Sequence, residues 1–188
     1  VIVEEYLQGE EVSVEVMVVN GRVNILQITD KLTTGAPYFV EMGHCQPSRH
    51  SMMMKEQISK VAIEAVQAVG IDRGPAHVEM MVTARGPIMI ELGARMGGDN
   101  ITTHLVPLST GIDMIKATID VSLGQEPDIR PKLHCGSAIR YFKVPQGIIK
   151  SINGIERAEV IPGVKQITFT KSVGDEATSI HCSNDRIG

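Results

Sequence analysis

Two glutamates in the segment 76–92, Glu79 and Glu91, have the types and the spacing to hold a cation. The segment is typical of a β-hairpin, and pairing Thr83 with Pro87 gives a favoured three-residue connection that ends on a glycine. In this register Glu79 lies directly opposite Glu91. Facing carboxylates repel each other and destabilise the hairpin, whereas a divalent cation between them makes the interaction favourable. Mg²⁺ commonly takes one or two carboxylates plus substrate phosphates. A slipped register with two solvated carboxylates is the alternative.

The loop after this hairpin strengthens the metal interpretation. Arg95 follows Glu91 and leads into Gly97 and Gly98. Glycines let a backbone approach a ligand closely, and a guanidinium beside two carboxylates suits a phosphoryl group or a substrate carboxylate. A glycine pair alone is more often an ordinary turn, so its position directly after the second glutamate carries the argument.

The elements that position these residues are predicted from periodicity. Valines alternate with other residues over 12–18, which is typical of a strand. Asn20-Gly21 predicts a tight hairpin turn that leads into a return strand over 23–30. The polar segment 31–47 is expected to be a long loop, of the kind that often carries function.

Two helical regions follow. An apolar stripe at three- and four-residue steps predicts a helix over 51–69, ended by Gly70. A second helical region is expected to break at Pro107 and to resume over 110–123. The residues expected on its inner face are Ile112, Ile115, Ile119 and Leu123.

The fold class predicted from these elements is α+β. Residues 1–130 are expected to form a lobe with an antiparallel sheet flanked by helices, and residues 131–188 a small β-rich C-terminal appendix. The appendix is inferred from short strand-like runs separated by Gly and Pro, at 137–144, 147–151, 159–161 and 166–170. Because residues 1–7 read as a strand from the first residue, the chain is expected to be a piece of a longer protein.

Composition excludes some classes of function. The 188 residues carry a net charge of -4 and 3% aromatic residues, so neither nucleic acid nor an acidic membrane surface is expected as a partner. No apolar run reaches the ~20 residues that span a bilayer, and no basic-then-apolar leader is present. Three cysteines fit a reducing cytoplasm better than a disulfide framework.

The motifs together resemble a known family. The run 4–15 (EEYLQGEEVSVE) looks like the adenine-lining strand of ATP-grasp enzymes, and HVE at 77–79 followed by IELGAR at 90–95 resembles their metal-binding strand pair. The chain is similar to the C-terminal half of a carboxylate–amine ligase, near the L-amino acid ligases and more distantly biotin carboxylase and carbamoyl phosphate synthetase. Where many ATP-grasp enzymes have Asn, this chain has Gly93, which the amino acid ligase branch tolerates.

The resemblance implies a role for each matching residue. Glu4, Glu5 and Leu7 would line the adenine, and Glu11 would accept the ribose hydroxyls. Glu79 and Glu91 would bind Mg²⁺ or Mn²⁺ bridging the ATP phosphates, while Arg95 would stabilise the acyl phosphate. The implied substrate-binding residues are Glu41, His44, Gly97 and Gly98.

Without the family, Glu41 and His44 are polar residues in a loop, for which solvation is the ordinary outcome. The activity implied is ATP-dependent activation of a carboxylate, expected to be an amino acid, and its coupling to an amine. A bicarbonate-using carboxylase or carbamoyl-phosphate-type enzyme and a non-catalytic ATP-grasp remnant acting as an interaction module are the alternatives. The family's phosphate clamp lies in its first half, so this chain alone is expected to be inactive. A homodimer is left open.

Overall fold

The computed structural model describes all residues from Val1 to Gly188. They form two compact units. The first unit comprises Val1–Leu32 and His44–Ile139, and the second comprises Thr33–Gly43 and Arg140–Gly188. The boundary predicted at residue 130 lies upstream of the boundary after Ile139, and the second unit also takes in a segment from within the predicted first lobe. No helix of the chain combines the length and apolar character that crossing a bilayer requires.

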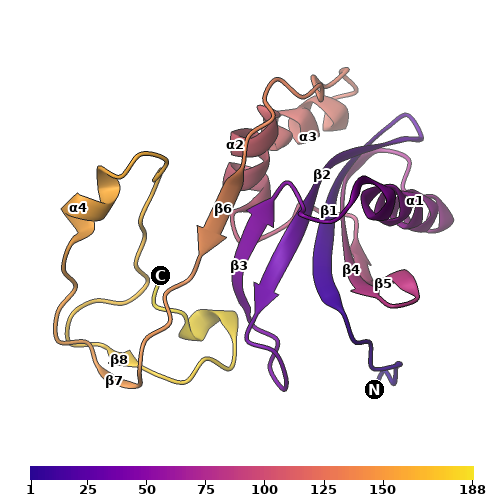
Figure 1. Cartoon of the computed structure of the whole chain (residues 1–188). Coiled ribbons are helices and arrows are strands. Elements are labelled where there is room, and N and C mark those ends of the chain that lie inside the picture. The colour runs from indigo at the N-terminus through magenta and orange to yellow at the C-terminus, as the bar shows by residue number, and fades with distance from the viewer. The chain divides into compact units, whose positions relative to one another are not determined.

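A six-stranded sheet is the main element of the fold, with the strand order β5-β4-β1-β2-β3-β6 (Figure 1). The pairs β1/β2, β1/β4 and β4/β5 are antiparallel, as expected. The strands are β1 Glu10–Val19, β2 Arg22–Thr33, β3 Glu41–Gln46, β4 Gly74–Thr83, β5 Gly86–Gly93 and β6 Ser137–Arg140.

The turn between β1 and β2 is the one predicted. Asn20 and Gly21 have φ of 50° and 76°, the left-handed values that this turn requires of both residues. The register shifts farther along the pair, where Glu15 lies opposite Gln27 but Val16 opposite Ile25. The extra residue in β2, Leu26, is a bulge.

Helix α1 (Met52–Ala68) packs on one face of the sheet and confirms the predicted helix (Figure 1). The Ser51 side chain accepts a hydrogen bond from the backbone N–H of Met54, which caps the first turn. The buried residues of this face are Ile58, Ala62 and Val66 from the helix and Val12, Val14, Val16, Val18, Ile28, Ala76, Val78 and Met80 from the strands.

The second helical region covers one end of the opposite face. It consists of a π-helical turn η1 (Ile101–Leu105), α2 (Val106–Thr110) and α3 (Met114–Ser122). Pro107 does not interrupt it, because Pro107 lies in the first turn of α2, where its missing N–H has no helical partner to lose.

The inner face predicted for α3 is wrong at three of four positions. Ile112 is buried, but Ile115, Ile119 and Leu123 are exposed. Asp113 caps the helix by accepting from Lys116 N, and the buried stripe is instead Met114, Ala117 and Val121, which pack with Met17 and Leu26 of the sheet.

Two further expectations for the first half of the chain are wrong. Residues 1–7 form no strand; the side chains of Val1, Ile2 and Val3 are exposed, and a strand without a neighbour gains no ladder hydrogen bonds. The predicted loop 31–47 is mostly strand, because β2 continues to Thr33 and β3 begins at Glu41.

The second unit contains less strand than predicted. Its regular elements beyond β6 are β7 Gly147–Ile148, the short helix α4 Ile155–Glu159, β8 Glu176–Ala177 and a 3₁₀ turn Ser183–Asp185. The strands expected at 159–161 and 166–170 are absent. Val160 and Ile161 of the first run are exposed, so that short apolar run does not mark a buried strand. The start of the predicted strand at 137–144 is confirmed by β6.

Candidate functional site on the polar face of the sheet

The sheet face opposite α1 carries polar side chains where α3 does not cover it. On β1, Glu11, Ser13 and Glu15 alternate with the valines buried against α1. Ser13 lies opposite Glu79 on β4, and Glu15 lies opposite His77. These two strands therefore bring their charged residues together on one face.

A buried carboxylate–imidazole pair forms the centre of this face. Glu15 is 0% exposed and His77 is 4% exposed. Oε1 of Glu15 lies 2.6 Å from Nδ1 of His77. The other ring nitrogen of His77, Nε2, lies 3.1 Å from Oε1 of Glu79. Both nitrogens therefore face carboxylate oxygens, which accept but do not donate when ionised.

Lys31 extends the network from β2. Its Nζ donates to Oε2 of Glu79 at 2.7 Å and to Oε1 of Glu11 at 3.4 Å. The Lys31 side chain is only 4% exposed, so these contacts are shielded from solvent and gain strength from the low local dielectric. Glu79, one of the two predicted metal ligands, thus touches two cationic side chains of the protein.

The network shifts the pKa of two of its members. Burial lowers the pKa of His77, but hydrogen bonds to Glu15 and Glu79 and their charges outweigh it and raise the pKa to about 9. The hydrogen bond from His77 and, against the effect of burial, the bond and charge of Lys31 lower the pKa of Glu79 to about 2. At neutral pH His77 is therefore an imidazolium beside the ionised carboxylate of Glu79.

The predicted pairing of the two glutamates is confirmed: Glu79 lies directly opposite Glu91. The turn is tighter than expected, since Thr83 pairs with Gly86 rather than with Pro87. Gly86 has a φ of 103°, so the predicted left-handed glycine is present. The register recovers because Ile90 is an extra residue between the partners of Met80 and Glu79.

Arg95 lies where the sequence places it. Its Nη2 donates to Oε1 of Glu91 at 3.1 Å, and its Nη1 to the carbonyl of Met96 at 3.2 Å. Each glutamate of the facing pair therefore has a cationic partner, Lys31 and His77 for Glu79 and Arg95 for Glu91. Their mutual repulsion is answered within the protein and does not by itself require a metal ion.

The donor set nevertheless fits Mg²⁺. The two carboxylates, Glu79 and Glu91, come from directly paired positions, the low pKa of Glu79 keeps it ionised, and hard cations prefer oxygen ligands. A carboxylate offers about four lone-pair sites, so the contacts to Lys31 and His77 leave room for a metal. No group of three or more acidic, His or Cys side chains is arranged as a complete metal site.

The glycine loop after β5 packs directly on the buried pair. The N–H of Gly97 donates to Oε2 of Glu15 at 3.3 Å. A Cβ on Gly97 would lie 2.7 and 2.8 Å from the carboxylate oxygens of Glu15 and 2.8 Å from Nδ1 of His77, whereas a Cβ on Gly98 would meet nothing within 4 Å. Glycine is therefore required at 97 for close approach, to a side-chain pair of the protein itself, and not at 98.

The loop ends in two residues with left-handed backbone, Asp99 (φ 47°) and Asn100 (φ 61°). Oδ2 of Asp99 lies 3.3 Å from Nε2 of His44, which is 1% exposed on β3. His44 was predicted as a substrate-binding residue in a loop; it is a buried strand residue held against the glycine loop.

Glu41, the other residue predicted in the substrate loop, is the first residue of β3 and belongs to the second unit. Its carbonyl accepts a hydrogen bond from Nη1 of Arg186 at 3.1 Å. The Arg186 guanidinium lies over the Tyr141 ring, 3.8 Å from its centroid.

The predicted adenine residues lie outside the polar network. Glu4, Glu5 and Leu7 belong to the N-terminal stretch without regular structure. Glu5 pairs instead with Arg85 in the β4–β5 turn, at 2.6 Å between Oε1 and Nη2. Glu11, predicted to hold the ribose, is the one residue of this set that joins the network, through Lys31.

Reasoning from sequence assigned no role to Glu15, Lys31 and His77. The alternation that marked the valines of β1 also places Glu11, Ser13 and Glu15 on one face, and this was the available signal for Glu15. Lys31 carried no such signal, because the bulge at Leu26 shifts the pairing of β2 in a way that the hairpin turn does not reveal.

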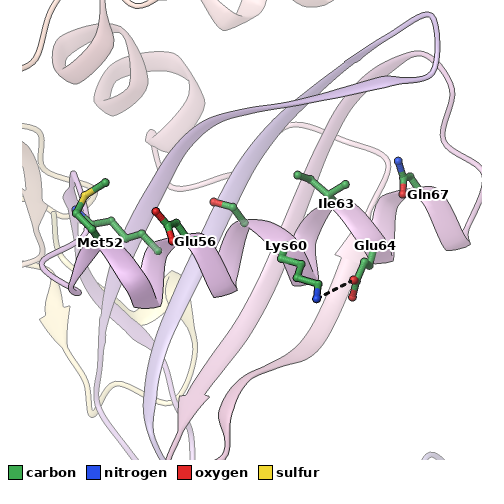
Figure 2. A pocket seen from close by; sticks show the side chains of 8 residues that line it. Met52, Glu56, Lys60, Ile63, Glu64 and Gln67 are labelled. Atoms are coloured by element: carbon green, nitrogen blue, oxygen red, sulfur yellow. Dashed lines mark ion pairs between the residues drawn. The ribbon is translucent and has the colours of Figure 1, made fainter.

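A hollow on the outer side of α1 does not belong to this site. Figure 2 shows that its lining side chains, among them Met52, Lys60 and Glu64, all come from one helix. Lys60 and Glu64 form an exposed pair one helical turn apart at 3.8 Å, which is ordinary helix-surface chemistry.

Two stretches of the chain match families of known proteins. Residues 1–104 match the family model described as ATP-grasp domain, and residues 140–188 match the one described as L-amino acid ligase C-terminal domain 2. Carnosine synthase 1 of Mus musculus is 29% identical over 123 residues, 65% of this chain and 15% of that protein. The L-arginine-specific L-amino acid ligase of Bacillus subtilis is 24% identical over 180 residues, 93% of this chain and 42% of that protein.

The fold is similar to that of a solved structure. The L-amino acid ligase from Bacillus licheniformis superimposes with a TM-score of 0.79 at 28% identity, over 91% of this chain and 43% of that chain. The chain thus spans less than half the length of the relatives that it matches.

Proposed function

Because the chain belongs to the ATP-grasp family, we propose that it forms the ATP- and Mg²⁺-binding half of a ligase that couples a carboxylate, in particular that of an amino acid, to an amine. The observation that carries the proposal is the facing pair Glu79 and Glu91 with Arg95 fixed beside it. Two facing carboxylates that can hold Mg²⁺, next to a guanidinium, suit a nucleoside triphosphate better than a neutral ligand.

The proposed reaction has two steps. The substrate carboxylate attacks the γ-phosphorus of ATP and releases ADP, which gives an acyl phosphate. The amine then attacks the acyl carbon, loses a proton and displaces phosphate, so that an amide bond replaces the acyl–phosphate bond. Both steps depend on positioning and charge neutralisation rather than on covalent help from the protein.

Residues of this chain supply parts of that positioning. Glu79 and Glu91 would hold Mg²⁺, which neutralises the phosphate oxygens when bound. Arg95, about half exposed and tethered to Glu91, is placed to stabilise negative charge that develops on the transferred phosphoryl group. Glu11 would contact the ribose, and the N-terminal stretch with Glu4, Glu5 and Leu7 would contact the adenine.

An amino acid is favoured over bicarbonate as the carboxylate substrate. The match of residues 140–188 to the L-amino acid ligase C-terminal domain 2 supports this choice. Gly93 at the end of β5 points the same way, since it replaces the Asn of many ATP-grasp enzymes. His44, Gly97 and Gly98 of the first unit would line the amino acid subsite, and Glu41 of the second unit is separately proposed as a substrate-binding residue. The substrates and the small-molecule partners of the whole protein are part of this proposal.

The test is phosphate release from ATP by the full-length protein with a panel of amino acid pairs. Glu91→Ala should abolish Mg²⁺-dependent release while circular dichroism shows an intact fold, because the exposed side chain supports no core contact. Glu64→Ala on the outer face of α1 is the matched control and should retain activity. Full activity of Glu91→Ala would reject the metal assignment, and release stimulated by bicarbonate instead of amino acids would reject the substrate class.

A further inference from the structure

Glu15 is a buried carboxylate to which the proposed function gives no role. It is 0% exposed in the middle of the sheet. Removing a charge from water is expensive, and a well-packed apolar residue at such a position is often as stable or more stable. Its sequence neighbours Val14 and Val16 lie on the opposite face of β1, in the core beneath α1, and Glu15 is the charged residue of β1 that is fully buried. A charge at this position therefore calls for a function beyond stability.

Glu15 touches two separate parts of the proposed site with its two oxygens. Oε1 lies 2.6 Å from Nδ1 of His77, whose Nε2 lies 3.1 Å from the carboxylate of Glu79. Oε2 accepts the N–H of Gly97 at 3.3 Å, in the loop that carries Arg95. One buried carboxylate thus links the metal ligand on β4 to the arginine loop after β5.

The linkage is packed tightly at both ends. The space beside Gly97 holds no Cβ, because the oxygens of Glu15 and the ring of His77 fill it. On its other side the same residue is held by Thr102, whose Oγ1 donates to the Gly97 carbonyl at 2.9 Å. Thr102 is itself 1% exposed, so the loop is fixed between the sheet and η1.

We propose that Glu15 is a positioning residue: through His77 it fixes the carboxylate of Glu79, and through the amide of Gly97 it fixes the loop that carries Arg95. The two groups on which phosphoryl transfer depends are then held in one mutual geometry by a residue that touches no substrate. This inference rests on the proposed function for its purpose, but the linkage itself is a property of contacts within the chain. Partners behind metal ligands typically contribute 10–100-fold to metal affinity or activity.

The sharpest variant is Glu15→Gln. It keeps the volume of the side chain but offers one acceptor oxygen where the structure uses two, so its NH₂ must face either Gly97 N–H or the ring of His77. Ser13→Ala is the matched control. Ser13 lies on the same strand and face, is equally buried, and its Oγ has no hydrogen-bond partner.

The primary measurement is Mn²⁺ binding to the full-length protein in the presence of ADP, followed by electron paramagnetic resonance. We expect Glu15→Gln to bind Mn²⁺ about 10–100-fold more weakly and to need correspondingly more Mg²⁺ for half-maximal phosphate release. Ser13→Ala should bind Mn²⁺ as the unmodified protein does. Added Mg²⁺ should recover part of the lost turnover of Glu15→Gln, which loss of folded protein alone would not allow.

A folded Glu15→Gln protein with unchanged Mn²⁺ affinity would overturn the proposal. If Glu15→Gln does not fold, His77→Gln tests the same linkage, since the amide carries its donors on one nitrogen whereas His77 contacts Glu15 and Glu79 through two. Unchanged Mn²⁺ affinity there would be equally decisive. The proposed function fails separately: a protein that binds Mn²⁺ but releases no phosphate with any amino acid pair is not the ligase, whatever Glu15 does to the metal.

Discussion

At the scale of single residues, the two glycines of the loop after β5 differ sharply although they are neighbours in sequence. Gly97 closes on Glu15 and His77, where an added methyl group would come within 2.8 Å of three polar atoms, while Gly98 faces open space. Neither has a left-handed φ, so the difference between them is one of space alone. A motif that reads as one glycine pair therefore contains one required glycine and one that tolerates a side chain.

Gly97→Ala should destabilise the chain by about 1–3 kcal/mol, the usual cost of forcing atoms into a packed site. Gly98→Ala should change the free energy of unfolding by no more than about 0.5 kcal/mol, as exposed substitutions do. Urea denaturation of the two variants measures both. Equal destabilisation by the two substitutions would show that Gly97 is not packed against the buried pair.

The His77–Glu79 contact predicts how stability depends on pH in metal-free protein. The folded pKa of His77 is raised to about 9, so its contribution is present in full below the unfolded value near 6.5 and is lost as the pH rises through 9. The folded pKa of Glu79 is lowered to about 2, so its contribution is present above about 4.5 and is lost as the pH falls through 2. Stability from this contact is greatest between those unfolded values.

The magnitude is on the order of 3 kcal/mol for the alkaline limb, from the conversion of pKa shifts to free energy. The acidic limb reflects largely the same contact and is not added to it. Urea denaturation in the presence of EDTA between pH 6 and pH 10 should show a decline that His77→Gln removes. An unmodified protein whose unfolding free energy is constant over this range would mean that His77 is not held between charged carboxylates.

At the scale of elements, α1 is the part of the fold that sequence reasoning described best. Its cap at Ser51 and its apolar stripe are local features, and helix periodicity requires no knowledge of partners. The facing of Glu79 and Glu91 was also predictable, although the turn and the bulge at Ile90 each depart from the expected register and compensate.

The elements that escaped prediction depend on contacts distant in sequence. β3 carries polar residues such as His44 and Gln46 because its neighbours satisfy them: Gln46 donates to Thr29 of β2 at 2.8 Å. The predicted face of α3 was wrong at Ile115 and Ile119, which are exposed, because the face that packs is selected by contacts of Met114, Ala117 and Val121 with the sheet. Lys31 lies in the site because of the bulge at Leu26, which no local sequence pattern predicts.

Helix α1 itself offers a matched test of its burial. Ile58 is 0% exposed against the sheet, whereas Ile63 lines the hollow on the outer side (Figure 2). Ile58→Ala should cost about 2–5 kcal/mol, the range for deleting a buried aliphatic side chain, and Ile63→Ala clearly less. Thermal or urea denaturation compares the two variants. A larger loss of unfolding free energy for Ile63→Ala than for Ile58→Ala would show that α1 does not bury the face that carries Ile58.

At the scale of the whole molecule, the polar face supplies only part of what phosphoryl transfer demands. Its cations are engaged with the protein's own carboxylates, as Lys31 is with Glu79 and Glu11 and Arg95 is with Glu91. A triphosphate needs several further donors on its oxygens, and the relatives that this chain matches are more than twice as long. Further donors for the phosphates are therefore expected from the parts of such longer proteins that this chain does not cover.

Accordingly, the isolated 188-residue chain should bind Mn²⁺ weakly through Glu79 and Glu91 and release no phosphate from ATP with any amino acid pair. The same chain within a polypeptide of its relatives' length should do both, because phosphoryl transfer begins only when further donors hold the triphosphate in position. Phosphate release by the two forms at equal concentration is the comparison. Turnover by the isolated chain would show that the polar face, with Arg95 and the carboxylate pair, is a sufficient catalytic site, and that the phosphates of ATP are held by residues already present between Val1 and Gly188.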